Sequence, residues 1–308
     1  TKGGSTMKRL ILSLAIAISA LSLITLVGCA KDSDIKKECI DAAKKDSALI
    51  AEVGIAKIDS LADLLEKFDF SAVNKIISRE CAIPESLLTK HPYKIKFMSA
   101  GTDKWANDLA GFVKRYTDTI FLSADYPSLY FDGVLLHEYI HSLTSIDSTN
   151  RAYRNFKWAD TLTREEWVKK GWSYSLPGIP HLLNEGITQW VTERVYSKSY
   201  HQNFDLPFLA YEKPVATVQI IADVVGPEVL MYAFLNGDVD SLQTAFNTEL
   251  GNNAWQEYLK RLSVCGERRT KKDAEKILSI TESFINSSEF SSPKPSPSKL
   301  PIRPAFLK

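Results

Sequence analysis

The chain is poor in cysteine and histidine and carries almost no net charge. It holds four Cys and five His among 308 residues, and 38 basic residues oppose 37 acidic ones. No C-x-x-C pair occurs, so the sequence supports neither a cysteine-ligated metal site nor a fold built on disulfides. One disulfide among Cys39, Cys81 and Cys265 is possible. The balanced charge argues against nucleic acid as a partner, because proteins that bind nucleic acids present a strong positive field.

A long apolar run does occur, at the N-terminus. The basic M-K-R at 7–9 precedes an almost unbroken apolar stretch over 10–27. A basic segment, an apolar segment and small residues before a cleavage point are typical of a secretory signal. The L-V-G-C at 26–29 resembles the bacterial lipobox, which implies that Cys29 is lipidated and begins the mature chain. An uncleaved transmembrane anchor is the alternative. Residues 1–6 look like an artificial extension or a mis-called start.

The most specific motif is H-E-x-x-H at 137–141, inside the apolar run G-V-L-L-H-E-Y-I-H-S-L. On a helix, residues i and i+4 share one face, so His137 and His141 can bind one metal ion from adjacent turns. Glu138 projects beside them, where it can take a proton from water. The motif is typical of a zinc peptidase and predicts one Zn²⁺ per chain, with Glu138 as the catalytic base.

A third ligand is needed, because a catalytic zinc usually has three protein ligands. No histidine follows His141 closely. Glu185, in L-L-N-E-G-I-T-Q-W-V, is the best candidate, because a carboxylate inside an apolar helix is costly without a partner. Glu193 and Glu212 are the fallback ligands. His181 is expected to lie on the surface or behind a metal ligand. His91 and His201 are expected to be ordinary polar residues.

Together, H-E-x-x-H and a later helix bearing N-E-G-x-T resemble the gluzincin metallopeptidases, over roughly 110–196. The resemblance implies that both motif histidines and Glu185 bind zinc and that Glu138 is the general base. It also implies that the strand over 119–123 is an active-site edge strand, which pairs with an extended substrate backbone.

Two more positions follow from the resemblance. Four residues after the glutamate ligand, thermolysin-like gluzincins have an Asp that orients a zinc-bound histidine. This chain has Gln189 there, which leaves the partner of the imidazole unidentified. Gluzincins also place a Tyr or His from a later helix at the oxyanion of the reaction. Tyr211 is our candidate for that catalytic role, ahead of Tyr196 and Tyr200.

Helical periodicity dominates on both sides of a short group of strands. The pattern over 33–88 predicts two or three short helices. A strand over 93–98 and a β-hairpin over 110–123 follow, and the helix over 128–144 carries the motif. A capping box begins a helix at 163–170, within an aromatic-rich connection. Further helices are predicted over 181–197, 214–225, 228–235 and 242–262.

The expected class is α+β: a small antiparallel or mixed sheet followed by a mainly helical zincin-like catalytic region, with an N-terminal helical segment. The expected divisions are a lipoprotein signal peptide (7–28), an N-terminal helical region (29–90), a zincin-like metallopeptidase domain (91–265), a C-terminal helix (266–290) and a disordered Pro/Ser-rich tail (291–308).

The expected function is that of a monomeric zinc-dependent peptidase acting on a peptide or protein substrate. A lipid anchor would hold it in the cell envelope, on the outer face of the plasma membrane or at the outer membrane. The alternative is a catalytically silent envelope lipoprotein that binds a peptide or protein partner through the same cleft. The intact Glu138 counts against that alternative, because a binding module needs no base.

Overall fold

The computed structural model describes residues 32–81, 84–88, 93–99, 110–114, 119–143, 181–200, 211–236, 238–265 and 270–287. Several sequence predictions lie outside these ranges: the extension and signal over 1–28, Cys29, the helix over 163–170 with its aromatic neighbours, His91, His201 and the tail over 291–308. Within the described ranges, no single helix has the length and apolar character to cross a membrane. The pair Glu212–Val225 and Pro227–Leu235 meets that test jointly but is bent by 112°.

The N-terminal region is a series of short helices. Residues 32–45 are helical, and α2 (Ser47–Val53), α3 (Ile55–Lys67), α4 (Phe70–Cys81) and α5 (Glu85–Leu88) follow. Asp46 ends the first helix and caps α2, since its side chain accepts from the backbone N–H groups of Ala48 and Leu49. Gly54, at φ 83°, then separates α2 from α3. The prediction of two or three helices here was wrong in number, because these local caps divide the helical pattern more finely.

Three strands form a small mixed sheet. They are β1 (Lys94–Met98), β2 (Gly111–Lys114) and β3 (Thr119–Ser123), in the order β1-β3-β2. β1 pairs with β3 in parallel, and β2 pairs with β3 as the predicted antiparallel hairpin. The expectation that the strand over 119–123 lies at an edge is wrong. β3 is central because it is hydrogen-bonded on both sides, and β2 is the edge strand of the hairpin.

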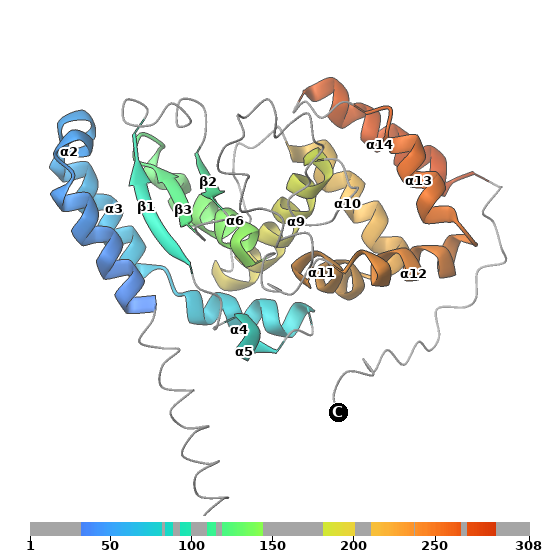
Figure 1. Cartoon of the computed structure of the whole chain (residues 1–308), viewed down its shortest axis with the longest axis horizontal. Coiled ribbons are helices and arrows are strands. Elements are labelled where there is room, and N and C mark those ends of the chain that lie inside the picture. The colour runs from blue at the N-terminus through green and yellow to red at the C-terminus, as the bar shows by residue number, and fades with distance from the viewer. Residues whose placement is uncertain are drawn as a thin grey trace, which may run out of the picture.

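Two helices at the centre of the molecule are largely buried, the first along nearly its whole length and the second over residues 182–192. A 3-10 turn, η3 (Ser128–Tyr130), leads into α6 (Phe131–Leu143), which carries the H-E-x-x-H motif and packs on β2 and β3. α9 (His181–Tyr200) lies across α6, as Figure 1 shows at the middle of the chain. Every residue of α6 except Asp132 is buried. A helix that is apolar all round belongs in a core, and the polar side chains of these two helices therefore need partners there.

The C-terminal part is helical throughout its described residues. It consists of α10 (Glu212–Val225), α11 (Pro227–Asn236), α12 (Val239–Leu250), α13 (Ala254–Leu262) and α14 (Lys271–Ile285). The single helix predicted over 242–262 is wrong, because Gly251 (φ 109°) and Asn253 (φ 66°) break it into α12 and α13. The chain is thus mostly helical with a small mixed sheet, which is compatible with the α+β class.

The N-terminal helices pack against the side of α6 that faces away from its histidines. The hydroxyl of Tyr139 donates to Oδ1 of Asn74 on α4 at 2.7 Å. The Tyr139 ring contacts Phe70 and Tyr93, with ring centroids 4.9 and 5.2 Å apart. Asp32 in turn accepts from the Tyr93 hydroxyl at 2.9 Å. These contacts hold α6 on the side opposite to the face that carries its two histidines.

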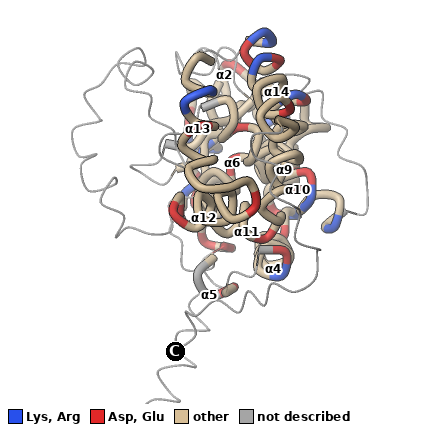
Figure 2. The backbone as a smooth tube through the Cα atoms, turned by 90° about the vertical axis from the view of Figure 1, so that its right-hand side faces the viewer, with Lys and Arg blue, Asp and Glu red and all other residues tan. Residues whose placement is uncertain are grey.

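Charges of both signs are interspersed over the outer turns of the helices. Figure 2 shows basic and acidic residues scattered over α10, α13 and α14, whereas the charged residues of α11 and α12 are all acidic. This distribution agrees with the near-zero net charge of the whole chain.

The ion pair between Glu80 and Lys198 joins α4 to α9 and yields a prediction. The hydrogen bond from the Lys198 ammonium lowers the pKa of Glu80, and burial opposes this only in part. A carboxyl with a lowered folded-state pKa stabilises the fold above its unfolded pKa of about 4.3, and that stabilisation is lost as the pH falls through the folded value. Lys198→Met should therefore lower the free energy of unfolding at neutral pH by up to about 1 kcal/mol.

Urea denaturation at neutral and acid pH checks this prediction. The difference between wild type and Lys198→Met should vanish once Glu80 is protonated in the folded state. Lys260→Met, on the exposed face of α13, is the matched control and should change stability little at either pH. A difference that is equally large in acid would contradict the assigned ion pair.

Candidate metal centre

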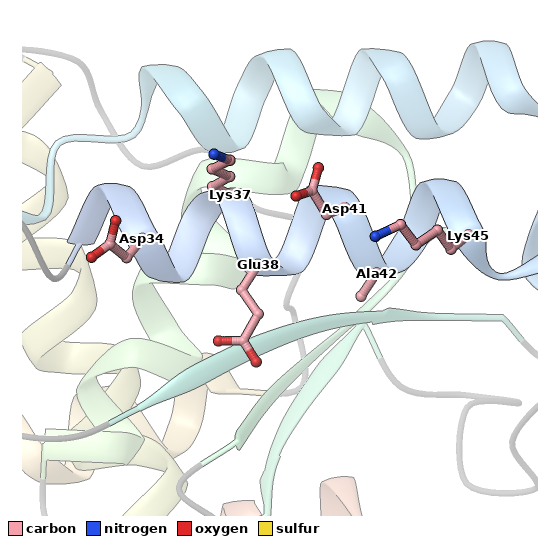
Figure 3. Close-up of a pocket in the computed structure, with 6 residues that line it drawn as sticks. All are labelled: Asp34, Lys37, Glu38, Asp41, Ala42 and Lys45. Carbon is pink, nitrogen blue, oxygen red and sulfur yellow. The ribbon is translucent and has the colours of Figure 1, made fainter.

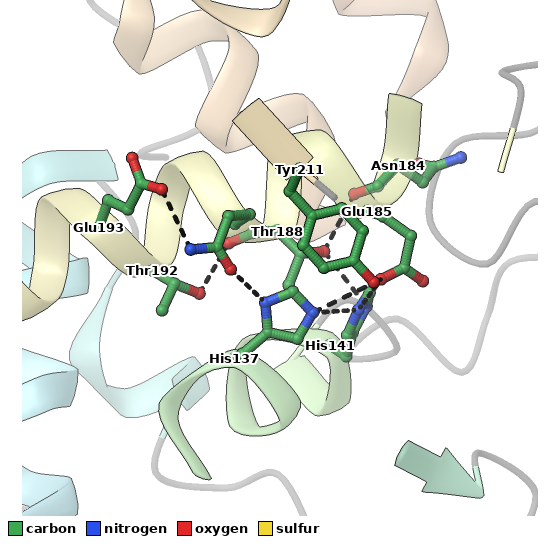
Figure 4. Close-up of polar contacts among 9 residues, drawn as sticks. His137, His141, Asn184, Glu185, Thr188, Thr192, Glu193 and Tyr211 are labelled. Atoms are coloured by element: carbon green, nitrogen blue, oxygen red, sulfur yellow. Dashed lines mark hydrogen bonds and ion pairs between the residues drawn. The ribbon is translucent and has the colours of Figure 1, made fainter. Parts of the chain in front are cut away.

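Helices α6 and α9 bring three metal-binding side chains to one point. His137 and His141 stand one turn apart on α6, and their Nε2 atoms lie 3.1 Å from each other. Oε2 of Glu185, on α9, lies 3.5 Å from the first of these nitrogens and 3.4 Å from the second. Figure 4 shows the three side chains pointing toward one another from the two helices. These residues could hold a metal ion, as the sequence predicted.

The spacing of the three atoms matches the dimensions of a metal site. A tetrahedral ion with bonds of about 2.0–2.1 Å holds neighbouring ligand atoms about 3.3–3.4 Å apart. The separations of 3.1, 3.4 and 3.5 Å lie close to that value on all three sides. Two imidazoles and one carboxylate are also the ligand set of a class of catalytic zinc sites. The donor geometry and the donor chemistry therefore both fit a small divalent cation.

Hydrogen bonds behind the imidazoles aim them at that point. Nδ1 of His137 lies 3.0 Å from Oε1 of Gln189, and Nδ1 of His141 lies 3.2 Å from Oγ1 of Thr188. The Thr188 hydroxyl also lies 3.1 Å from the carbonyl oxygen of Asn184. Because the hydroxyl proton of Thr188 is used in the bond to Asn184, its oxygen is left to accept a hydrogen bond from Nδ1 of His141. Both rings then carry their proton on Nδ1 and present an Nε2 lone pair to the same space, which is the tautomer that binds a metal.

Burial makes this arrangement costly without a positive charge. The three ligand residues are 5–7 % exposed. Burial alone would lower the pKa of His137, but the hydrogen bond with Glu185 and the charges of Glu138 and Glu185 outweigh it and raise that pKa. The site thus attracts a proton when no other cation is present. A metal ion would compete with that proton for the same lone pairs.

Glu138 lies outside the triad and against the edge strand. It is 7 % exposed, and its charge acts on His137. A Cβ placed on Gly111 of β2 would meet Cγ of Glu138 at 2.9 Å and the carbonyl oxygen of Phe121 at 2.9 Å. Gly111 therefore allows the backbone of β2 to pass directly beside the Glu138 side chain. The charge of the motif carboxylate thus acts on His137, and Glu138 is not one of the three clustered side chains.

Tyr211 also reaches the centre, from the start of α10. Its hydroxyl donates to Oε2 of Glu185 at 3.1 Å. Its ring stacks on His137, with centroids 5.8 Å apart and planes 16° from parallel. The approach depends on Gly186, where an added Cβ would lie 2.7 Å from Cβ of Pro214 and 2.9 Å from its carbonyl atoms. The glycine of the N-E-G sequence therefore serves close packing of α9 against α10, which places Tyr211 over the ligands.

The other candidates from the sequence do not join the triad. Glu193 accepts a hydrogen bond from Gln189 at 3.0 Å, and Glu212 is exposed, 3.9 Å from Lys213. Tyr196 is half-buried further along α9, and the side chains of His181 and Tyr200 lie outside the described residues. From the sequence, Thr188 was only the last residue of the N-E-G-x-T motif, with no contact assigned to it, and Gln189 had no role. Their positions three and four residues after Glu185, on the same helical face, were the available signal.

A separate hollow lies along the first helix, away from the metal triad. It measures about 440 Å³ and is lined by exposed residues of one helix face, shown in Figure 3: Asp34, Lys37, Glu38, Asp41, Ala42 and Lys45. Charges of both signs alternate along this face, which is typical of a solvated helix surface.

The Gly186 contact leads to a second prediction. Gly186→Ala should force α9 and α10 apart, because the new methyl group meets backbone atoms of Pro214 rather than a flexible side chain. We expect a loss of about 1–3 kcal/mol in unfolding free energy and displacement of Tyr211 from Glu185. Thermal unfolding measures the first effect, and quenching of tyrosine fluorescence by bound Co²⁺, compared with Tyr211→Phe, reports the second. Wild-type stability in Gly186→Ala would contradict the close approach.

The metal triad is the candidate metal site among the described residues. Comparison of the chain with protein-family models, with curated proteins and with solved structures finds no match in any of the three. His137, His141 and Glu185 could hold a metal ion, with Glu138 and Tyr211 beside them.

Proposed function

We propose that this protein is a membrane-anchored, extracytoplasmic, zinc-dependent peptidase of gluzincin type, with a zincin-like catalytic region. The observation that carries the proposal is the convergence of two Nε2 atoms and one carboxylate oxygen at tetrahedral spacing, with a second carboxylate, that of Glu138, outside the cluster. His137, His141 and Glu185 would hold the zinc ion, and Glu138 would act as the base. A structural zinc site would instead be closed by four ligands and rich in cysteine.

The chemistry divides among the residues present. When bound, zinc lowers the pKa of a coordinated water and polarises a substrate carbonyl. Glu138 takes the proton from the attacking water and passes it to the leaving amine. Tyr211, whose hydroxyl already donates to an oxygen of the centre, donates to the oxyanion that develops on the carbonyl. Gln189 and Thr188 hold the two imidazoles in the tautomer that leaves Nε2 without a proton.

A peptide substrate is supported by the position of β2. Among the described strands β2 pairs with β3 alone, so its other side is an edge of the described sheet. Its first residue, Gly111, lies against Glu138. An extended peptide can pair with such an edge through main-chain hydrogen bonds. Its carbonyl groups would then pass close to the base. This function requires β2, rather than β3, to receive the substrate.

Attachment to a membrane is supported by the sequence alone. The basic start, the apolar run over 10–27 and Cys29 after L-V-G predict a lipoprotein signal. The proposed enzyme would therefore act in the cell envelope, outside the cytoplasm.

Metal content tests the ligand assignment. The full-length chain, purified in detergent, should carry about one Zn²⁺ per molecule, measured by elemental analysis after reconstitution. His141→Ala and Glu185→Ala should each lose the ion, because two remaining ligands do not hold it against dilution. Zinc retained in Glu185→Ala would show that another side chain is the third ligand. A wild-type chain that takes up no zinc would favour the silent binding lipoprotein instead.

The base is tested by Glu138→Gln. The change keeps the size of the side chain and removes its basicity, so peptide hydrolysis should fall by about 10²–10⁴-fold while zinc content and stability stay the same. Hydrolysis of a library of quenched fluorescent peptides supplies the rate. Asp132→Asn, a matched carboxylate-to-amide change on the same helix, should leave the rate unchanged. Equal rates for wild type and Glu138→Gln would remove Glu138 from the mechanism.

A further inference from the structure

Gln189 occupies the place where the gluzincin pattern has an acidic residue, and it is tied into a chain of two hydrogen bonds. Its Oε1 lies 3.0 Å from Nδ1 of His137. Its Nε2 donates to Oε1 of Glu193, one turn further along α9, at 3.0 Å. Figure 4 draws these bonds as dashed lines that end on His137 and on Glu193. Gln189 is 2 % exposed, whereas Glu193 is only half-buried.

The orientation of the Gln189 amide decides which nitrogen of His137 carries the proton. An amide has an accepting and a donating end, and it can rotate to exchange them. With its oxygen toward the ring, it favours the Nδ1–H tautomer and leaves Nε2 free for a metal. With its NH₂ group toward the ring, it would favour the Nε2–H tautomer, which cannot bind. An ionised Glu193 accepts only, and it therefore selects the first orientation.

The charge balance of the centre explains why an amide suits this position. Glu138 and Glu185 already place two buried carboxylates beside the histidines. A third carboxylate at 189 would be at least as buried as these two and would be disfavoured by desolvation and by repulsion from them. The neutral amide avoids that cost, and the negative charge stands one turn away at Glu193, where water reaches it.

We propose that Gln189 and Glu193 form a positioning pair, in which Glu193 orients the amide of Gln189 and Gln189 holds His137 in its metal-binding tautomer. The functional consequence rests on the zinc site proposed above. The pair lies outside the H-E-x-x-H and N-E-G sequences, and the hydrogen bond of Glu193 is to Gln189 rather than to one of the three clustered side chains. It acts on the metal only through the imidazole.

Two variants separate this role from ordinary helix packing. Gln189→Met keeps the length of the side chain and removes both hydrogen bonds. Glu193→Gln keeps a hydrogen bond to Gln189 but makes its partner an amide that donates as well as accepts, so the Gln189 amide becomes free to rotate. A merely structural bond would survive in Glu193→Gln, whereas the orientation would be lost.

The tautomer of His137 is the direct measurement. Full-length, metal-free protein with ¹⁵N-labelled histidine, at a pH where the imidazoles are neutral, should show the proton on Nδ1 of His137 in long-range ¹H–¹⁵N spectra. Gln189→Met and Glu193→Gln should both show a mixture with the Nε2–H form. The Kd for Zn²⁺ should rise about 10–100-fold in Gln189→Met and should also rise in Glu193→Gln, at unchanged thermal stability of the latter.

Gln219→Met is the matched control. It removes a hydrogen bond of the same kind, from Nε1 of Trp190 on α9 to Gln219 on α10 at 2.9 Å, and should leave both the tautomer and the zinc affinity unchanged. His137 in the pure Nδ1–H form and a wild-type Kd in both test variants would overturn the proposal. A wild-type chain that binds no zinc would overturn the proposed function, and the tautomer comparison would still decide the role of the pair.

Discussion

Three lone pairs directed at one small, buried space are the constraint on which the rest of the structure depends. Two imidazole nitrogens and a carboxylate oxygen, 3.1–3.5 Å apart, repel one another unless a cation lies between them. Bringing them together from two helices therefore requires binding energy from elsewhere. The buried core supplies it: α6 is held from behind by Tyr139, Asn74 and their aromatic neighbours, and α9 is held by α10 and α4.

Close backbone contacts bring the catalytic candidates to this space. Gly111 lets the edge strand pass Glu138, and Gly186 lets α10 bring Tyr211 over the ligands. Each glycine stands where a single methyl group would meet backbone atoms. Neither has a positive φ, so what they contribute is space rather than backbone freedom. The shape of the centre therefore depends on the lack of a side chain at Gly111 and Gly186 as well as on the side chains around it.

The three metal-binding side chains could be predicted from helix periodicity and from the cost of burying a charge. The i, i+4 spacing placed His137 and His141 together, and the cost of a lone buried carboxylate pointed to Glu185. The hairpin and most helices were also predicted correctly in kind and position. What could not be predicted depends on partners far away in the sequence or on single torsions. β3 became central because β1 pairs beside it, and the helix over 242–262 is broken by backbone angles at Gly251 and Asn253.

The role of Gln189 also could not be predicted from the sequence. From the sequence it was a departure from a pattern, because an amide supplies no charge to an imidazole. Its partner Glu193 was visible only as a fallback ligand. The structure places the two side chains in one hydrogen-bonded chain, and the acidic group stands one turn further from the metal position than in the family that the sequence resembles.

The contact between Gly111 and Glu138 also bears on how such a protein could change its role during evolution. Alanine at position 111 would press on the base and on the β3 backbone, while all three metal ligands lie on other elements. On the function proposed above, one nucleotide change in a glycine codon would therefore separate metal binding from turnover. A descendant with an intact H-E-x-x-H sequence would then bind a metal ion and extended peptides without hydrolysing them.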